Sequence, residues 1–189
     1  MNLWRLDCGA QTILVGGDEN LAEVFYWGAL LPESENLKSI WNITRLDYSG
    51  GALDGVPALS ICPEVSKTFN GHPGMRIRGA SGKRLYPNFR LTNAKLSKTS
   101  LLLEYEDPEI GLTYKANFRA HKETSVFELS ASLTANTDIL VDWFAAPVLP
   151  ATQAAQKMID FSGHWCREFQ KQETDWSIGA RLRNNQTGR

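Results

Sequence analysis

Apolar and polar residues alternate strictly in the second half of the chain. From 112 to 120, and again from 127 to 133, every second residue is apolar and the residues between are mostly polar or small. Successive side chains of a β-strand point to opposite faces, so this period of two predicts two strands with one buried face each. Ser100–Asp107 and Ile139–Ala145 also have the composition of strands, and the connections are short. The pattern therefore predicts an antiparallel meander packed on one side.

The N-terminal part has a similar but shorter pattern. The apolar run Gln11–Val15 ends at Gly16 and Gly17, and a second run extends over Leu21–Leu31. Two apolar runs separated by turn residues predict an antiparallel hairpin. Gly28 inside the second run indicates a bulge or a close backbone approach.

Two irregular segments separate these regions, at 32–55 and 56–90. The first contains the apolar residues Ile40, Trp41 and Leu46, so we expect an ordered loop. In the second, Arg76 and Arg78 alternate with apolar residues, which predicts a strand with one charged face.

Composition supports a chain built from strands and turns. Six Trp, eight Phe and five Tyr accompany 15 Gly and 8 Pro. The formal net charge of -1 argues against a nucleic-acid partner, which needs a clustered positive field. There is no apolar stretch long enough to cross a bilayer and no basic region followed by an apolar run at the start, so we expect no membrane or signal segment.

The three cysteines, Cys8, Cys62 and Cys166, are odd in number and lack metal-type spacing. Reduced thiols in a cytoplasmic protein are therefore expected. The sequence contains no glycine-rich phosphate loop, no Gly-x-Ser-x-Gly elbow and no histidine pair spaced for a metal. The residues thus predict one all-β sandwich domain over 1–189, with no catalytic residue, metal or cofactor site.

A nine-residue stretch near the C-terminus, Asp160–Glu168, combines aromatic, flexible and charged residues. Gly163 would let the backbone bend two residues before Trp165 and present the indole as a flat face. A flat apolar face beside hydrogen-bonding groups suits a sugar ring. The alternative is a core tryptophan on a strand with a surface Arg167–Glu168 pair, because large aromatic side chains are usually buried.

A second candidate is Asp47, which lies between Leu46 and the flexible tip Tyr48–Gly51. An acid in such a loop can serve a binding site. It can equally be a turn or cap residue, and the residue types alone leave both possibilities open.

Taken together, four motifs resemble the N-terminal domain of family 36 glycoside hydrolases, the bacterial-type alpha-galactosidases. They are Phe25–Gly28, Arg45–Asp47, Phe161–Glu168 and the C-terminal Asn184–Arg189. Their order and spacing over the whole chain carry the resemblance. The section around Pro63 and Glu64 departs from the family pattern, so no site residue is transferred from it.

The resemblance implies a large antiparallel β-sandwich, or supersandwich, that caps a (β/α)8 barrel. In the family the barrel holds two catalytic aspartates that act by a retaining mechanism. A barrel needs about 250 residues, and this chain shows no alternating βα pattern. The resemblance therefore implies that this chain is one domain of an enzyme that hydrolyses terminal alpha-galactose residues. We expect the chain to be inactive alone.

The resemblance also implies roles for the two candidates. Asp47 would accept hydrogen bonds from sugar hydroxyls, and Trp165 would stack against the ring. Cys166 stands where the family commonly has glycine. For Arg167 and Glu168 we keep a structural interpretation, in which they pair across strands and hold the Trp165 loop. The implied partners are a galactose-containing oligosaccharide, the missing barrel and further copies in a homo-oligomer, with no cofactor.

Two other functions stay open. A free-standing carbohydrate-binding sandwich would bind galactosides by itself. We expect such a module to close its sheet, whereas strand periodicity here runs toward the end without a closing turn or a helix. A purely structural domain would use its aromatic residues only in the core.

Overall fold

The computed structural model describes residues 1–44, 57–152 and 154–177. Its contacts divide the chain into two compact units, Met1–Pro150 and Ala151–Arg189. Each unit is described by itself below. The single domain over 1–189 stays a prediction.

One layer of the first unit is a four-stranded antiparallel sheet in the order β6-β7-β8-β9. Its strands are β6 (Arg90–Leu96), β7 (Ser100–Asp107), β8 (Leu112–His121) and β9 (Val126–Ala135). The β8–β9 register is unbroken from Leu112↔Ala135 to His121↔Val126. This sheet confirms the predicted antiparallel pairing for β7, β8 and β9, but it does not contain the strand that was predicted at Ile139–Ala145.

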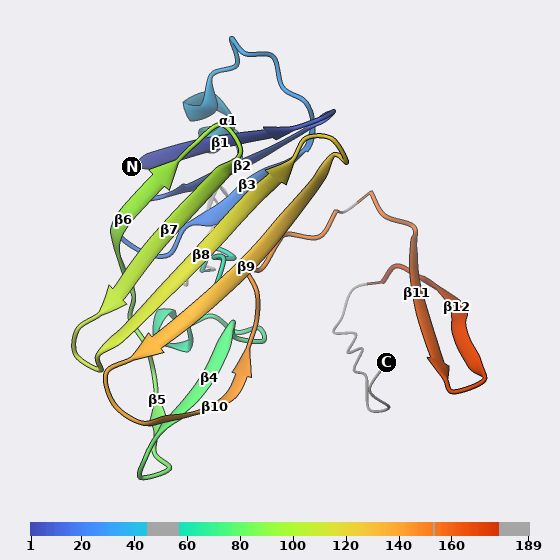
Figure 1. Cartoon of the computed structure of the whole chain (residues 1–189). Helices are drawn as coiled ribbons and strands as arrows, with labels where there is room; N and C mark the ends of the chain where they lie inside the picture. The colour runs from blue at the N-terminus through green and yellow to red at the C-terminus, as the bar shows by residue number, and fades with distance from the viewer. Residues whose placement is uncertain (45–56, 153, 178–189) are drawn as a thin grey trace, which may run out of the picture. The chain divides into compact units, whose positions relative to one another are not determined.

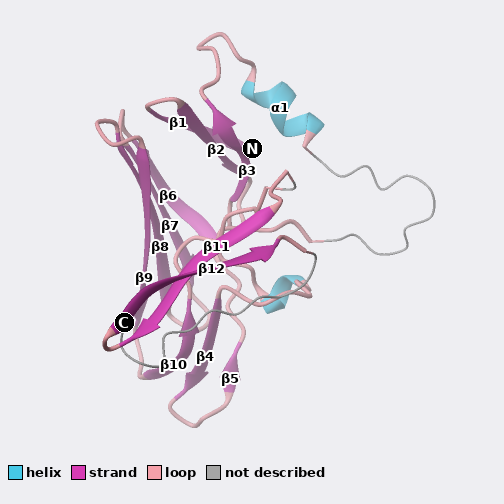
Figure 2. Ribbon diagram, turned by 90° about the vertical axis from the view of Figure 1, so that its right-hand side faces the viewer, coloured by secondary structure: helices cyan, strands magenta, loops and turns pink. Residues whose placement is uncertain are grey.

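The facing layer consists of two three-stranded sheets (Figures 1 and 2). The first has the order β1-β2-β3, with β1 (Asn2–Cys8), β2 (Gln11–Gly17) and β3 (Glu23–Ala29). The second has the order β10-β4-β5, with β4 (Met75–Gly79), β5 (Arg84–Leu85) and β10 (Ile139–Phe144). All pairs are antiparallel, so the all-β class is confirmed.

The core lies between these layers and follows the alternation in the sequence. β8 buries its even-numbered positions from 112 to 120, and β7 buries Leu101, Leu103 and Tyr105. The backbone N–H of Ala22 donates to the Tyr105 hydroxyl at 3.2 Å, which gives this buried phenol a partner. Burying apolar area at about 25 cal/mol per Å² is the main force that holds the layers together.

Several elements differ from the sequence-based expectation. β1 was not predicted, and β10 leaves the meander to pair with β4. Gly28 is not a bulge, because the β2–β3 register shifts between Leu14 and Val15 instead. A Cβ at Gly28 would lie 3.0 Å from the Tyr26 hydroxyl oxygen, so the group close to the glycine is a side chain and not another backbone segment.

The segment expected to be a loop after residue 32 contains a helix, α1 (Leu37–Ile43). Asn36 caps it by accepting hydrogen bonds from the backbone N–H groups of Lys38 and Ser39. Trp41 is the buried residue of this helix, and its ring meets Phe25 edge-on at 5.1 Å. A short 3-10 helix, Val65–Lys67, follows in the next irregular segment.

The described part of the second unit is one hairpin, β11 (Lys157–His164) and β12 (Arg167–Asp175). The pairing runs from Lys157↔Asp175 to His164↔Arg167. None of its described residues is buried. Among the residues described in both units, no helix is long and apolar enough to cross a membrane.

Candidate functional site

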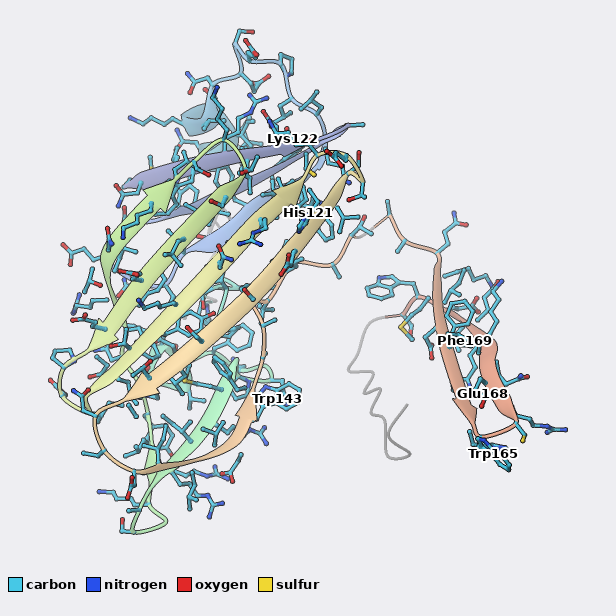
Figure 3. The ribbon with its side chains drawn as sticks, in the orientation of Figure 1. His121, Lys122, Trp143, Trp165, Glu168 and Phe169 are labelled. Atoms are coloured by element: carbon cyan, nitrogen blue, oxygen red, sulfur yellow. The ribbon has the colours of Figure 1, made fainter. Side chains whose placement is uncertain are left out.

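The structure describes one of the two sequence-predicted site residues, and the sugar-binding role of both stays a prediction. Asp47 lies outside the described residues, so its predicted role stays a prediction. Trp165 lies at the tip of the β11–β12 hairpin, in the turn between the strands (Figure 3). Its exposed fraction is 73%, which excludes a core tryptophan within this unit and leaves the indole free to meet a ligand.

The hairpin can form its turn because residue 163 is a glycine. The β11–β12 register shifts between Ser162 and His164, so the strand bends at this position. A Cβ atom built on Gly163 would lie 2.5 Å from the Arg167 carbonyl oxygen, and no real side chain tolerates that distance. The predicted bend before Trp165 is therefore present, and its cause is the close approach of the two strands.

Local hydrogen bonds hold the turn. The Cys166 backbone N–H donates to Glu168 Oε1 at 3.2 Å, and His164 Nδ1 lies 2.9 Å from the Trp165 carbonyl oxygen. Cys166 adopts a left-handed backbone conformation with φ of 66°, where glycine is most easily accommodated. Glu168 thus supports the turn through a local bond to the backbone of Cys166.

Further aromatic side chains extend the exposed surface of the hairpin. The Phe161 and Phe169 rings meet edge-on with centroids 6.5 Å apart, and both are exposed. Figure 3 labels Phe169 and Glu168 on β12 and Trp165 at the tip. Sequence reasoning did not select Phe169. The spacing of Phe161 and Phe169 around the turn could have indicated that they meet across the hairpin.

The hairpin offers apolar ring faces beside carboxylate, amide and imidazole groups. This is the chemistry of carbohydrate recognition, in which C–H faces stack on aromatics and hydroxyls bind polar groups. Within 1–44, 57–152 and 154–177, no cluster of three or more His, Cys, Asp or Glu residues could hold a metal ion.

The two-layer antiparallel sandwich is also found in solved alpha-galactosidases. Structures of the enzyme AgaA from Geobacillus stearothermophilus include a variant in complex with raffinose, which matches 94% of this chain with a TM-score of 0.74 and 15% identity. An alpha-galactosidase from Lactobacillus brevis matches the same share with a TM-score of 0.69 and 17% identity. At these identities the likeness concerns the fold.

The chain spans 28% of the length of these two enzymes. A third structure, AgaB from Geobacillus stearothermophilus, gives a TM-score of 0.71 at 14% identity, with 95% of this chain and 29% of that one covered. No curated protein matches the sequence.

The family model that describes the glycosyl hydrolase family 36 N-terminal domain matches residues 20–189. The chain therefore belongs to this family, and the family resemblance noted in the sequence is confirmed.

Proposed function

We propose that this chain is the N-terminal sandwich of an alpha-galactosidase and that it supplies substrate contacts to an active site whose catalytic residues lie elsewhere. The match to the family 36 N-terminal domain over 20–189 carries the proposal. Support also comes from the exposed indole of Trp165 on a turn held by Gly163 and Glu168. The AgaA structures with raffinose and stachyose concern enzymes that share this fold.

In the proposed mechanism this domain recognises the sugar and performs no proton transfer. Trp165 covers the C–H face of the terminal galactose, while Asp47 accepts hydrogen bonds from its hydroxyls. A sugar with one hydroxyl inverted leaves carboxylate lone pairs unpaired, which disfavours it strongly. The hydrolysis itself requires a nucleophile and a general acid/base, which we place in a barrel beyond this chain.

The test compares variants of the whole protein that carries this chain. Trp165→Ala and Asp47→Ala should each lower kcat/KM for raffinose by roughly 10- to 100-fold, because each removes contacts to the bound sugar. Trp143→Ala is the matched control, since Trp143 is an exposed tryptophan on β10 of the first unit. Unchanged kcat/KM in both site variants would refute the proposed contacts.

The 189-residue chain alone should hydrolyse no galactoside. A titration with galactose, followed through the indole NMR signals of its six tryptophans, separates the proposal from a free-standing binding module. A module gives a saturable shift at Trp165 that Asp47→Ala abolishes. The proposed capping domain gives no shift at millimolar sugar, because half of the site is absent.

We also infer that the protein acts in the cytoplasm as a homo-oligomer. The three free cysteines, two of them buried, support a reducing compartment. Sedimentation of the whole protein tests the oligomeric state, and a monomer would contradict it.

A further inference from the structure

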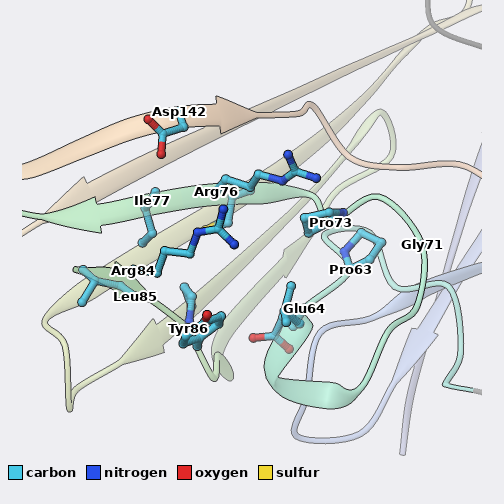
Figure 4. A pocket seen from close by; sticks show the side chains of 13 residues that line it. Pro63, Glu64, Gly71, Pro73, Arg76, Ile77, Arg84, Leu85, Tyr86 and Asp142 are labelled. Carbon is cyan, nitrogen blue, oxygen red and sulfur yellow. The ribbon is translucent and has the colours of Figure 1, made fainter. Parts of the chain in front are cut away.

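The first unit contains a pocket of about 320 Å³ that lies apart from the hairpin in sequence and belongs to a single compact unit. It lies beside the β4–β5 pair and the loop that precedes β4 (Figure 4). Its volume is in the range of sites that take small molecules. Arg76, Arg84, Tyr86, Glu64 and Asp142 supply its polar lining.

Three arginines lie on this small sheet, and one of them is already paired. Arg78 and Arg84 are directly opposite one another on β4 and β5, an arrangement that is unfavourable without an anion nearby. Asp142 supplies one anion. It binds Arg78 through two hydrogen bonds, Nε–Oδ2 at 2.8 Å and Nη2–Oδ1 at 2.6 Å.

The geometry of β10 directs Asp142 to that pairing. The β10–β4 register shifts between Val141 and Trp143, so Asp142 is the extra residue of a bulge. Both carboxylate oxygens are engaged by Arg78, and the side chains of Arg76 and Arg84 make no hydrogen bond or ion pair with another described residue. Their charges act on Asp142 only at longer range, where they help Arg78 to lower its pKa. Among the described residues, the pocket therefore has two guanidinium groups that no carboxylate binds directly.

The other wall offers hydrogen-bonding groups. In Figure 4 the side chains of Tyr86 and Glu64 lie below the two guanidinium groups. Tyr86 is exposed, and Glu64 is buried with Oε1 accepting the Phe89 backbone N–H at 2.8 Å. Burial raises the pKa of Glu64 to about 7, so this acid does not cancel the positive charge of the arginines at slightly acidic pH.

We propose that this pocket binds a small oxyanion, a carboxylate or phosphate group carried on a body no larger than a monosaccharide. Arg76 and Arg84 bind the anion, because guanidinium groups match the geometry of carboxylate and phosphate oxygens. Tyr86 and Glu64 face the body of the ligand. The residues of this pocket differ from Asp47 and Trp165, and its proposed ligand is charged, whereas theirs is a neutral sugar.

The experiment is an NMR and calorimetric titration of the 189-residue chain at low salt with inorganic phosphate and, separately, galacturonate. Neutral galactose serves as the uncharged control. We expect saturable binding of at least one anion, with shifts at the backbone amides of β4 and β5. Arg76→Gln and Arg84→Gln should each weaken it at least about tenfold, since each removes one charge-assisted contact.

Arg119→Gln on β8 removes the same charge from the four-stranded sheet and should leave binding unchanged. Equal losses in all three variants would mean attraction by net charge, and they would overturn the proposal. So would the absence of saturation by either anion at about 10 mM, a concentration that detects even millimolar affinity. Circular dichroism shows that each variant is folded, and Trp165→Ala, which tests the galactoside site, should not change anion binding.

Discussion

The two units of this chain differ in how many of their side chains are buried. In Met1–Pro150, two sheet layers enclose a continuous core of fully buried aromatic and aliphatic side chains. In the described part of Ala151–Arg189, two long strands pair well, yet none of their residues is buried. Isolated two-stranded hairpins are at best marginally stable in water.

This difference shows that two strands of one chain can pair regularly without burying their side chains. Burial makes the first unit stable, and alternation of residues sets which face is buried. The hairpin has instead Phe161, Trp165 and Phe169 on its surface. Such exposure is typical of a surface used for binding, which agrees with the proposed contact of Trp165 with sugar.

The largest expected effect compares one phenylalanine in each unit. Phe118 is fully buried in β8, whereas Phe161 is exposed in β11. Phe118→Ala should lower the free energy of unfolding by about 3–5 kcal/mol, because it removes buried area and leaves a cavity. Phe161→Ala should change it by less than about 0.5 kcal/mol. Urea denaturation measures both, and a similar loss in the two variants would show that the hairpin has a hidden core.

The buried carboxyl group of Glu64 should make the stability of the first unit depend on pH. Burial, the largest cause, raises the pKa of Glu64 from 4.5 to about 7; the Phe89 N–H and Lys67 oppose this shift, and Asp107 adds to it. The folded state therefore binds this proton more tightly than the unfolded state. Its stabilising contribution is complete below pH 4.5 and is lost as the pH rises to about 7.

Glu64→Gln removes this pH-dependent loss of stability, because the glutamine side chain does not ionise. Its amide oxygen can still accept a hydrogen bond from the Phe89 N–H. Relative to the natural chain, the variant should gain up to roughly 3 kcal/mol of stability between pH 5 and pH 8. Denaturation at the two pH values measures the gain. Glu123→Gln, which removes an acid from the β8–β9 turn, is the control, and an equal gain in the control would count against burial as the cause.

Helix α1 tests a smaller contribution within the first unit. Asn36→Ala removes the side-chain acceptor for two backbone N–H groups at the helix start. It should cost about 1 kcal/mol of unfolding free energy. Glu35→Ala beside it makes no such cap and should cost less. Thermal denaturation compares the two, and equal shifts would refute the capping role.

The smallest global effect is expected from the hairpin turn. Gly163→Ala places a Cβ against the Arg167 carbonyl oxygen, so amide protection in β11 and β12 should fall. The free energy of unfolding of the unit Met1–Pro150 should differ from that of the natural chain by less than about 0.5 kcal/mol. Gly79→Ala is the control, because its Cβ would meet only Leu85 at 3.9 Å. Unchanged hairpin protection would show that the turn does not require glycine.

Sequence patterns predicted the fold where burial is periodic. Strands β7, β8 and β9 follow the alternation closely, since their inward positions form the core. Helix α1 was missed because seven residues are too few to show a helical repeat of apolar positions. The cap at Asn36 marks where this helix begins. The pairing of β10 with β4 was missed because strand partners are set by tertiary packing.

Some features of the candidate site could likewise be predicted from the sequence, and others could not. The bend at Gly163 could be predicted, because a glycine before an aromatic residue indicates a local backbone requirement. The exposure of Trp165 could not, since the same residue type occurs in cores and on surfaces. The pocket beside Arg76 and Arg84 depends on residues far apart in sequence, from Glu64 to Asp142, and no local motif marks it.

The distribution of the three thiols makes the hairpin convenient to observe. Cys8 and Cys62 are buried, and burial raises the pKa of Cys62 to about 12, so it holds its proton at neutral pH. Cys166 is exposed at the hairpin tip, next to Trp165. A maleimide dye should therefore attach at this position in the natural sequence, without engineered cysteines. Its fluorescence would report directly when a sugar or another part of the protein covers the tip.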